Sequence, residues 1–378
     1  MKILELCLSP GLGGLELYMF RCANALAQNQ HVVAVVTDTG KLREYFREHA
    51  DTAVHTLAKS SKHLPLINAR RLARIIDSEH IDVVHMHWGN DLALAALAKK
   101  LSVSKPALVY TRQMTITRYK NDWYHRFMYA EMDLMLTITR QLEREAKRFV
   151  PVDDAQVTTL YYGVTPPSTW LTADAIRHQR DQLGFDADDF VIGLFGRLEH
   201  GKGQHLLIEA LAMDSDDAPQ LKALIVGHEM KPGYRDELQR LAKNLGVSAN
   251  MAFMDFVAAP QMLMQVCDCV TLASEEETFG LVLPEAMRCG IAVIGSNRGG
   301  VPEIITHEKT GLLFESGEAS SLHQQICRLY TDPDFKEQLA ETGKLEADER
   351  FDADDHFQAL EKHILQTTRG QATTEVKT

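Results

Sequence analysis

Short apolar runs alternate along the whole chain with segments whose apolar residues recur at helical spacing. Continuous apolar runs are typical of buried parallel strands, and their alternation with helices predicts an α/β fold with parallel sheets. In the first half, the predicted strands lie near Ile3–Leu8, His31–Val36, Ala53–Leu57, Asp82–Met86, Ala107–Tyr110, Leu134–Thr137 and Val157–Leu160.

The pattern stops between Gly163 and Pro167 and then restarts. The second set of predicted strands lies near Phe190–Phe195, Leu221–Val226, Met251–Phe253, Cys269–Leu272, Ile291–Ile294 and Gly311–Phe314. We therefore predict two doubly wound, Rossmann-like domains, residues 1–166 and 167–350. Two such domains in succession imply a cleft walled by the carboxyl edges of their sheets.

The chain is predicted to end in helices near Glu318–Tyr330, Pro333–Thr342 and Asp355–Thr367. The remaining residues, 368–378, are mostly polar. We expect this tail to be disordered, because it offers little apolar surface to bury.

The composition is that of a globular protein. The 378 residues are 45% apolar, which is enough for two domains, and no apolar run approaches a membrane span. The first residues, K-I-L-E-L-C-L, are too short and too acidic for a signal peptide. Six cysteines without a C-x-x-C pair predict free thiols in a cytoplasmic protein.

Charge is unevenly distributed along the chain. The net charge is −12, yet residues 1–165 hold 21 Lys and Arg against 17 Asp and Glu. A basic amino half suits anionic lipid headgroups or a phosphorylated acceptor, and solvated helix surfaces are the alternative. Peripheral contact with the inner face of the cytoplasmic membrane follows from the first interpretation. The acidic total and the lack of interleaved aromatic residues argue against nucleic acid.

The richest motif is A-S-E-E-E-T-F-G-L-V-L-P-E-A-M-R-C-G, residues 273–290. Gly280 and Pro284 separate Glu277 from Glu285, so the two glutamates do not share one continuous helix. Proline in a first turn and glycine at the end predict a loop and then a short helix from Pro284 to Cys289.

This loop is predicted at the carboxyl edge of a parallel sheet, where open α/β folds bind ligands. The amides of Phe279, Gly280 and Leu281, with the positive start of the next helix, suit an anion or a ring of hydroxyls. Glu275 and Glu276 are interpreted as residues of an acidic, helix-capping loop.

A second motif, G-R-L-E-H-G-K-G at residues 196–203, joins a predicted strand to a helix. Arg197 and Lys202 are five residues apart across this glycine-rich turn, so both can converge on one anion. Arginine offers a fork that matches phosphate oxygens, and lysine offers a point charge. The alternative is a surface turn with two solvated cations.

A third glycine-rich segment, P-G-L-G-G-L-E, follows the first strand and opens the first helix, a position that suits a phosphate. A dinucleotide fingerprint would use Gly11 and Gly13 here, with Asp38 as ribose ligand. Glu16 occupies the third glycine position, however, and its carboxylate disfavours a pyrophosphate.

The segment D-V-V-H-M-H ends the fourth predicted strand. Alternation places His85 and His87 on one side of it, which would suit a metal, but the sequence shows no third ligand. D-x-D triplets, which hold Mg²⁺ in metal-dependent transferases, are interpreted as solvated caps. They are Asp186/Asp188, Asp214/Asp216 and Asp352/Asp354. We predict no metal.

Together these motifs resemble the family-four retaining glycosyltransferases with the GT-B fold, also known as glycosyl transferases group 1. The resemblance rests on G-G-x-E, D-V-V-H-x-H, G-R-L…K-G, E-x7-E, G-G-V-P-E-I-I and K-T-G-L-L-F in family order. It implies that the last helix, about residues 355–367, crosses back to the first domain.

The resemblance also implies roles for single residues. Arg197 and Lys202 would hold the nucleotide diphosphate, Glu277 the sugar hydroxyls and Glu285 the ribose hydroxyls, with His87 beside the donor sugar. The other residues implied on the donor side are Gly13, Gly14, Gly227, Phe256, Phe279, Gly280 and Leu281. Phe256 either faces the base or fills the core. Arg112, where many relatives have histidine, and Glu16 are the candidates on the acceptor side.

The resulting prediction is a retaining, metal-independent glycosyltransferase without a cofactor. It would move a hexosyl or related group from a UDP or GDP sugar to a hydroxyl of a saccharide or lipid-linked saccharide. The family and the basic amino half suggest bacterial cell-envelope polysaccharide or lipopolysaccharide biosynthesis. The alternatives are an NAD-dependent Rossmann oxidoreductase, a catalytically silent nucleotide-sugar-binding protein and a related GT-B enzyme such as a non-hydrolysing epimerase.

Overall fold

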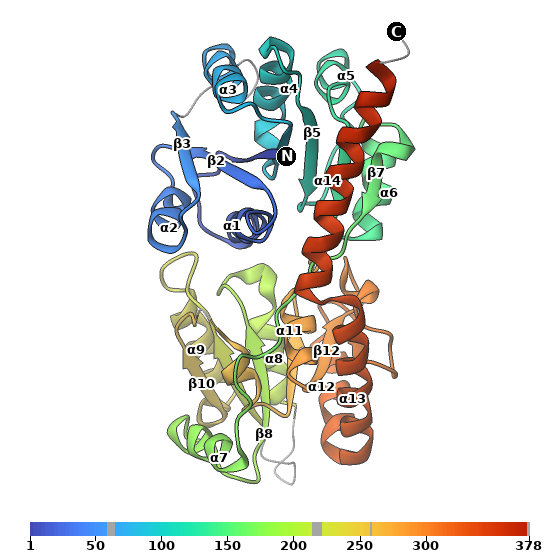
Figure 1. Ribbon diagram of the computed structural model, residues 1–378. Helices are drawn as coiled ribbons and strands as arrows, with labels where there is room; N and C mark the ends of the chain where they lie inside the picture. Colours follow the sequence, from blue (N-terminus) through green and yellow to red (C-terminus); the bar gives the residue numbers. More distant parts are fainter. Residues whose placement is uncertain (59–64, 214–220, 258, 376–378) are drawn as a thin grey trace. The chain divides into compact units, whose positions relative to one another are not determined.

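The chain forms two compact units in a computed structural model (Figure 1). The structure describes residues 1–58, 65–213, 221–257 and 259–375. Unit 1 comprises Met1–Tyr161 and Asp354–Thr378, and unit 2 comprises Tyr162–Ala353. The first boundary precedes the predicted one at residue 166, because Val164 belongs to unit 2. Its amide donates to the Phe351 carbonyl at 2.8 Å, and it pairs with Asp352.

Unit 1 is built on a parallel sheet that has seven strands among the described residues, in the order β3-β2-β1-β4-β5-β6-β7. Its strands are β1 (Lys2–Cys7), β2 (His31–Thr37), β3 (Ala53–Leu57), β4 (Val83–Met86), β5 (Ala107–Arg112), β6 (Leu134–Thr137) and β7 (Val157–Thr159). Most residues of the central strands are buried, as expected for apolar runs covered on both faces. The predicted parallel α/β fold is confirmed.

The helices of unit 1 follow its strands in alternation (Figure 1). They are α1 (Gly14–Leu26), α2 (Lys41–His49), α3 (Leu66–Glu79), α4 (Leu92–Leu101), α5 (Trp123–Tyr129), α6 (Arg140–Phe149) and α14 (Ala353–Glu375), with 3₁₀ turns η1 (Gly89–Asp91) and η2 (Asp154–Gln156). Side-chain caps set some starts. Asp122 accepts from the amides of Tyr124 and His125 at α5, and Thr139 accepts from Leu142 at α6.

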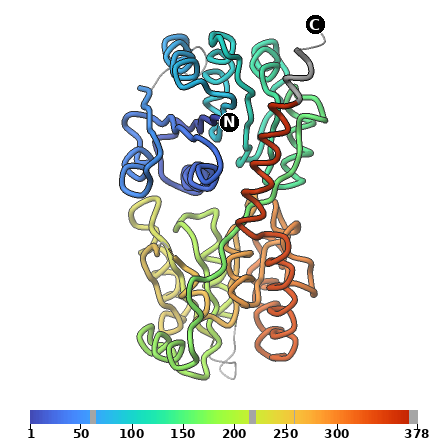
Figure 2. The backbone as a smooth tube through the Cα atoms, viewed as in Figure 1, coloured from blue at the N-terminus to red at the C-terminus, as the bar shows by residue number. Residues whose placement is uncertain are grey.

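The C-terminal helix α14 belongs to unit 1, as Figure 2 lets the reader follow along the chain. Glu361 on α14 accepts hydrogen bonds from Asn29 at 3.0 Å and Gln30 at 2.6 Å, and Leu360 is fully buried. The predicted helix end at Thr367 was wrong, because α14 continues to Glu375. No proline interrupts the extension, and lengthening a formed helix is easier than starting one. Residues 376–378 lie outside the described residues.

Unit 2 has a second parallel sheet, six-stranded in its described part, in the order β10-β9-β8-β11-β12-β13. Its strands are β8 (Phe190–Phe195), β9 (Leu221–Val226), β10 (Met251–Met254), β11 (Cys269–Leu272), β12 (Ala292–Ser296) and β13 (Leu312–Phe314). Its helices are α7 (Ala173–Gln182), α8 (Gln204–Leu211), α9 (Tyr234–Asn244), α10 (Gln261–Met264), α11 (Val282–Arg288), α12 (Ala319–Thr331) and α13 (Pro333–Arg350), and its 3₁₀ turns are η3 (His200–Lys202), η4 (Ser248–Asn250) and η5 (Val301–Glu303). The helix predicted to end at Thr342 therefore runs on to Arg350.

Each sheet reverses its strand order at one point, between β1 and β4 in unit 1 and between β8 and β11 in unit 2. The loops that leave neighbouring strands at such a point diverge and leave a crevice at the carboxyl edge. Most predicted site residues follow β1, β4, β8 or β11, whereas Arg112, Gly227 and Phe256 lie at the ends of β5, β9 and β10. Within the described residues, no helix combines the length and apolar character needed to cross a membrane.

Candidate functional site

The loops after β8 and β11 come together in unit 2. Lys202 Nζ lies 2.6 Å from Glu277 Oε2, and the Glu275 amide donates to the Gly201 carbonyl at 3.1 Å. The side chains of Lys202 and Glu277 are 21% and 22% exposed, so both can be reached by a ligand. Two motifs about 75 residues apart in sequence thus supply one charged pair.

Glycines make this close approach possible. Gly203 has φ +72°, and a Cβ atom there would lie 2.1 Å from the Ala273 carbonyl oxygen. Gly299, at φ +65°, would place a Cβ 2.2 Å from the Glu277 carbonyl oxygen. Side chains at these positions would push the Lys202 and Glu277 loops apart. Gly227, predicted to touch the donor, packs against Gly196 in the same manner, since its Cβ would lie 1.8 Å from the Gly196 oxygen.

Arg197 lies on the same loop as Lys202 but has a different partner. Its Nη2 lies 3.0 Å from Glu199 Oε1, and the side chain is 51% exposed. The Arg197 carbonyl accepts a hydrogen bond from the buried Gln204 side chain at 2.8 Å, which fixes the turn beneath it. Convergence of Arg197 and Lys202 on one anion stays a prediction.

The E-x7-E segment has the expected loop-then-helix form. α11 begins at Val282, before Pro284, and Glu285 lies in its first turn. Gly280 takes φ +93° at the turn, where a larger residue would be strained. Ser274 Oγ donates to Glu277 Oε2 at 3.3 Å, so Ser274 and Lys202 both bind this one oxygen of the glutamate.

The two phenylalanines predicted on the donor side differ in environment. Phe279 is 2% exposed and packs edge-on against Tyr162 and Phe351, with ring centroids 5.3 and 5.8 Å apart. Its side chain is therefore part of the core of unit 2. Phe256 is 61% exposed beside His228, at 5.8 Å between ring centroids, so the core alternative for Phe256 was wrong. The residue follows β10, the outermost strand of the described sheet.

In unit 1 a buried carboxylate joins the two histidines of β4. Glu5, on β1, is 0% exposed, and its Oε1 and Oε2 lie 3.0 Å from His85 Nδ1 and 2.5 Å from His87 Nε2. Thr111 on β5 binds His85 Nε2 at 2.7 Å. The register of the sheet explains the cluster, because Glu5 and His85 are direct partners on β1 and β4.

Burial and pairing shift the pKa values of this cluster. Burial alone would raise the pKa of Glu5, but the charge and hydrogen bonds of His85 and His87 outweigh it and lower this pKa to about 2. Burial, together with the charge of His85, lowers the pKa of His87 to about 4. Glu5 is therefore ionised and His87 neutral near pH 7.

The structure brings a third potential metal ligand to the histidines. Potential ligand atoms of Cys22, His85 and His87 lie within 4.8 Å of one another, and all three residues are buried. A metal ion would have to displace the hydrogen bonds of Glu5 and Thr111 to use most of the ring nitrogens. We therefore assign no metal to this cluster.

The glycine-rich loop after β1 is braced by Glu16. Its Oε2 accepts from the Gly13 amide at 2.8 Å, and its Oε1 accepts from the Ser9 hydroxyl. The bond from the Gly13 amide is one half of a capping box at the start of α1, since Gly13 has no side chain to supply the other half. A Cβ at Gly14 would meet open space. Glu16 is 7% exposed, so its bonds within the loop account for this residue, and an acceptor role stays a prediction.

Arg112 is likewise engaged within unit 1. Its guanidinium donates to the Met114 and Thr115 carbonyls at 2.7 and 2.8 Å and to the Tyr110 hydroxyl at 2.9 Å. The residue is 7% exposed. These contacts fix the chain after β5, and binding of an acceptor by Arg112 stays a prediction.

The acidic triplets have structural contacts where the structure describes them. Asp189 Oδ2 accepts from the Asp186 amide at 2.7 Å, and Asp352 pairs with Arg288 at 3.0 Å. Asp214 and Asp216 lie outside the described residues. The Asp352 pair agrees with a structural role for its triplet. The Asp186 contact uses only the backbone amide of that residue, so a capping role for Asp186 and Asp188 stays a prediction.

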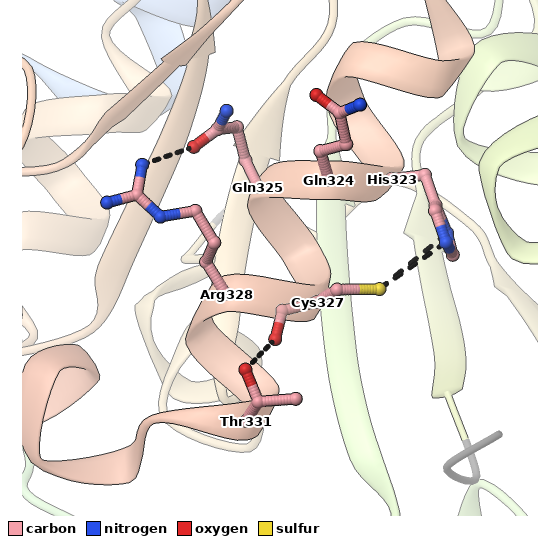
Figure 3. A pocket seen from close by; sticks show the side chains of 6 residues that line it. All are labelled: His323, Gln324, Gln325, Cys327, Arg328 and Thr331. Atoms are coloured by element: carbon pink, nitrogen blue, oxygen red, sulfur yellow. Dashed lines mark hydrogen bonds between the residues drawn. The ribbon is translucent and has the colours of Figure 1, made fainter.

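A shallow pocket on α12 contains none of the predicted site residues. Its walls are His323, Gln324, Gln325, Cys327, Arg328 and Thr331. Figure 3 shows that these side chains mainly meet one another, with Arg328 beside Gln325 and Thr331 bonded to the Cys327 carbonyl. This arrangement offers no convergent catalytic groups.

Comparison with known proteins identifies the family. Residues 12–166 match the model "Glycosyltransferase Family 4", and residues 175–346 match "Glycosyl transferases group 1". The chain belongs to the family 4, group 1 glycosyltransferases. It is a glycosyltransferase with two Rossmann-like units of the GT-B fold.

Its relatives cover the chain broadly. The N-acetyl-alpha-D-glucosaminyl L-malate synthase of Bacillus anthracis is 26% identical over 356 residues, 90% of this chain and 91% of its own. The D-inositol 3-phosphate glycosyltransferase of Actinosynnema mirum is 30% identical over 281 residues, 69% and 67% of the two chains. The crystal structure of Anabaena HepE in complex with UDP matches with a TM-score of 0.85 and 26% identity, covering 97% and 100%.

Sequence reasoning missed Glu5, although a signal was present. A single carboxylate stands at the centre of the apolar run K-I-L-E-L-C-L. A charged residue in a strand that is covered on both faces needs a buried partner, and the two histidines of a neighbouring strand could have been proposed.

Proposed function

We propose that this glycosyltransferase retains anomeric configuration and uses a nucleotide diphosphate sugar of the UDP type. The observation that carries the proposal is the Lys202–Glu277 pair, 2.6 Å apart, on the two loops that flank the switch point of unit 2. A cation and a carboxylate side by side suit a ligand that presents phosphate oxygens next to sugar hydroxyls. The Anabaena HepE structures in complex with UDP, and with UDP and glucose, support the choice of base.

In the proposed reaction the difficult event is departure of the nucleotide diphosphate from an oxocarbenium-like carbon. Preorganised charges that meet the departing oxygens stabilise this state, and one such donor contributes about 3–4 kcal/mol. Lys202, already desolvated in part and held by Glu277, needs little reorganisation to do so. Arg197 adds a second cation from the same loop.

Glu277 and Glu285 are proposed to bind hydroxyls of the sugar and of the ribose. When the diphosphate binds, Lys202 gains a second anionic partner and binds Glu277 less tightly. The Glu277 carboxylate can then accept hydrogen bonds from the sugar hydroxyls. No covalent nucleophile is assigned, and the acceptor hydroxyl attacks on the face from which the diphosphate leaves. The departing phosphate oxygen takes its proton.

The proposal includes neither a metal nor a cofactor. The cations Lys202 and Arg197 would supply the charge that Mg²⁺ supplies elsewhere. The pairing of Asp352 with Arg288 at 3.0 Å in one of the described D-x-D triplets supports this assignment.

A thermal-shift series against nucleotides, followed by transfer assays, tests the proposal. UDP and then UDP sugars should stabilise the protein, and transfer should persist in excess chelator with retention visible in the product by NMR. Binding of NAD in place of nucleoside diphosphates would select an oxidoreductase. Donor binding without transfer or hydrolysis, over a panel of acceptors, would select a silent binding protein.

We also propose that unit 1 meets a lipid-linked saccharide acceptor of envelope polysaccharide or lipopolysaccharide assembly, from the cytoplasmic face. Trp123 and Phe127 are spaced one helical turn apart on α5 and are 80% and 43% exposed. Lys100 Nζ lies 4.7 Å from the Phe127 ring centre. Exposed aromatic residues beside a cation suit the interface of an anionic bilayer. Sedimentation with phosphatidylglycerol vesicles should be lost in Trp123→Ser, and binding unchanged by that substitution would contradict the assignment.

A further inference from the structure

The segment 112–126 runs from the end of β5 into α5, at the carboxyl edge of the sheet of unit 1. It holds four lysines and arginines and a single acid. That acid, Asp122, caps α5 by accepting from the amides of Tyr124 and His125, and its Oδ2 lies 2.6 Å from His125 Nδ1. The positive charge of the segment is therefore not balanced within it.

Two of these cations have no partner. Among the described residues, neither Arg118 nor Lys120 makes an ion pair or a side-chain hydrogen bond. Lys147 of the same unit, by contrast, lies 2.7 Å from Glu143. The exposed Arg118 alone would call for no explanation, because a solvated cation needs no partner. Lys120 is different, since this residue is half-buried.

Lys120 is fixed at the end of α6, where its amide donates to the Phe149 carbonyl at 2.8 Å. Burial, followed by the charges of Arg112 and Arg118, lowers the pKa of Lys120 below its ordinary value. Three cations thus act on one small region, and their mutual repulsion is offset when an anion enters it.

The guanidinium of Arg112 supplies a fixed charge to this region. It donates to two backbone carbonyls, which are neutral, so these bonds hold the cation without cancelling its charge. Glu145 contributes negative charge near Arg112, but its Oε2 accepts from the Ile116 amide at 3.1 Å, and it forms no ion pair with a described cation. An anion at this segment would therefore be bound by Arg118 and Lys120, with the charge of Arg112 in support.

Exposed rings flank Lys120 in the sequence. Tyr119 and Trp123 are 65% and 80% exposed, and the Tyr119 hydroxyl accepts from Asn121 Nδ2 at 2.9 Å. Such rings bind apolar surface, whereas the cations beside them bind an anion. The segment thus fits a phosphate that carries an apolar group better than it fits a free inorganic anion.

We propose that Arg118 and Lys120 form a binding site for the phosphate group that joins the acceptor saccharide to its lipid. This inference rests on the proposed lipid-linked acceptor of unit 1 and narrows it to acceptors that carry a phosphate next to the lipid. Arginine binds two phosphate oxygens with its fork, and lysine adds a point charge. Tyr119 and Trp123 contact the part of the lipid that follows the phosphate.

Hexyl phosphate is a soluble probe of this site. The protein is first saturated with UDP, so that the diphosphate site proposed in unit 2 is filled. The chain has three tryptophans, and the indole NMR signal that is lost in Trp123→Ser is that of Trp123. Hexyl phosphate should shift this signal saturably, whereas hexanol at the same concentrations should not. No shift with hexyl phosphate, or an equal shift with hexanol, would overturn the proposal.

Substitutions separate the two cations from positive charge in general. Lys120→Met and Arg118→Met should each raise the Kd of hexyl phosphate about tenfold or more, since each removes a charge-assisted hydrogen bond. Lys120→Arg keeps the cation and should bind more tightly than Lys120→Met. Lys147→Met is the matched control, because it removes a cation that already has a partner in Glu143, and it should leave this Kd unchanged. Equal Kd values for the wild type, Lys120→Met and Arg118→Met would contradict the assignment.

Folding of each variant is checked by its melting curve and by its Kd for UDP. Arg118 is exposed, so Arg118→Met still tests the site if Lys120→Met is unstable.

A bilayer headgroup is the other source of phosphate for these cations. If they serve only a bilayer surface, Arg118→Met should weaken sedimentation with phosphatidylglycerol vesicles while hexyl phosphate fails to bind in solution, and the acceptor assignment is then wrong. The proposed function fails in a different way. A wild type that does not bind UDP would refute the nucleotide-sugar donor, whatever the result with hexyl phosphate.

Discussion

The two units of this glycosyltransferase hold their polar residues in different ways. In unit 2 the side chains of Arg197, Lys202 and Glu277 are 51%, 21% and 22% exposed. In unit 1, Glu5 and Arg112 are 0% and 7% exposed, and each makes two or more hydrogen bonds within the unit. Arg197, Lys202 and Glu277 follow β8 and β11, which flank the switch point of unit 2, whereas Glu5 lies within β1 and Arg112 ends β5.

The partly exposed groups of unit 2 can exchange their partners for a ligand, whereas the buried groups of unit 1 have a structural role. A partly exposed ion pair contributes little to stability, so a ligand can take over one of its members at low cost. A buried charge with several hydrogen bonds cannot leave them without a penalty of several kcal/mol. We infer that the partly exposed charges of unit 2 are available to a ligand, whereas Glu5 and Arg112 of unit 1 are held by bonds within their own unit.

The largest effect expected is on catalysis in unit 2. Lys202→Met removes the cation that is proposed to meet the leaving diphosphate, and we expect kcat to fall about 10²- to 10³-fold. The melting temperature should change little, because the pair with Glu277 is partly exposed. Steady-state transfer assays and a thermal melt measure the two quantities.

Lys222→Met is the control for Lys202→Met. Lys222 lies on β9 of the same unit, and its Nζ is 3.4 Å from Asn250. Its loss should leave transfer intact. Near-normal turnover of Lys202→Met at saturating donor would show that the Lys202 charge does not stabilise the departing diphosphate.

The next prediction concerns stability in unit 1. Arg112→Met breaks three hydrogen bonds and leaves the Met114 and Thr115 carbonyls without their partner, so we expect the free energy of unfolding to fall by about 2–4 kcal/mol. Arg197→Met in unit 2 is the matched substitution and should change it by less than about 0.5 kcal/mol. Urea titrations of both variants make the comparison. If Arg112→Met had wild-type stability but a raised KM for the acceptor, Arg112 would bind the acceptor and would not have the structural role assigned here.

The sequence could predict much of the fold because it depends on local pattern. β6, β8, β9 and β11 begin and end where the apolar runs do, since a strand covered on both faces is mainly apolar. The end of α14 was predicted less well. A polar, proline-free stretch can continue a helix or leave it, and nothing in residues 368–375 specifies which.

The candidate site shows a similar limit. The motifs predicted that Lys202 and Glu277 serve one ligand, and the structure places them 2.6 Å apart. They could not predict that Phe279 would turn into the core, because a loop residue beside a glycine can face either way. Glu5 was missed for a related reason, since its partners come from another strand and are visible only once the register of β1 and β4 is known.

A pH-dependent difference is expected from Asp91, a buried residue of unit 1. Burial raises the pKa of Asp91 to about 7 from 3.8, although its bond from the Leu8 amide lowers it. A folded-state pKa above the unfolded value gives stability that is present at low pH and lost as pH rises through about 7. Asp91→Asn keeps an acceptor for Leu8 but does not titrate.

Asp91→Asn should therefore become more stable relative to the wild type as pH rises from 5 to 8, by about 1–3 kcal/mol. Urea titrations of both proteins at each pH measure the difference. The opposite trend of His87 and His356, whose pKa values burial lowers to about 4, cancels because both proteins contain these residues. A difference that is constant over this range would mean that Asp91 is ionised throughout.

The smallest effects are expected for Phe256 and Phe279. One is exposed and the other buried, so the two allow the same comparison within unit 2. Phe256→Leu removes an exposed ring after β10, and if the nucleobase stacks there, KM for the donor should rise about five- to tenfold, in keeping with the 1–3 kcal/mol of a base–aromatic stack. Its stability should not change. Phe279→Leu should leave KM for the donor unchanged. It should lower the free energy of unfolding by about 1–2 kcal/mol, because the ring packs against Tyr162 and Phe351. Donor titrations with UDP and with uridine isolate the base contact, and equal affinities of Phe256→Leu and wild type for uridine would place the nucleobase elsewhere on the unit.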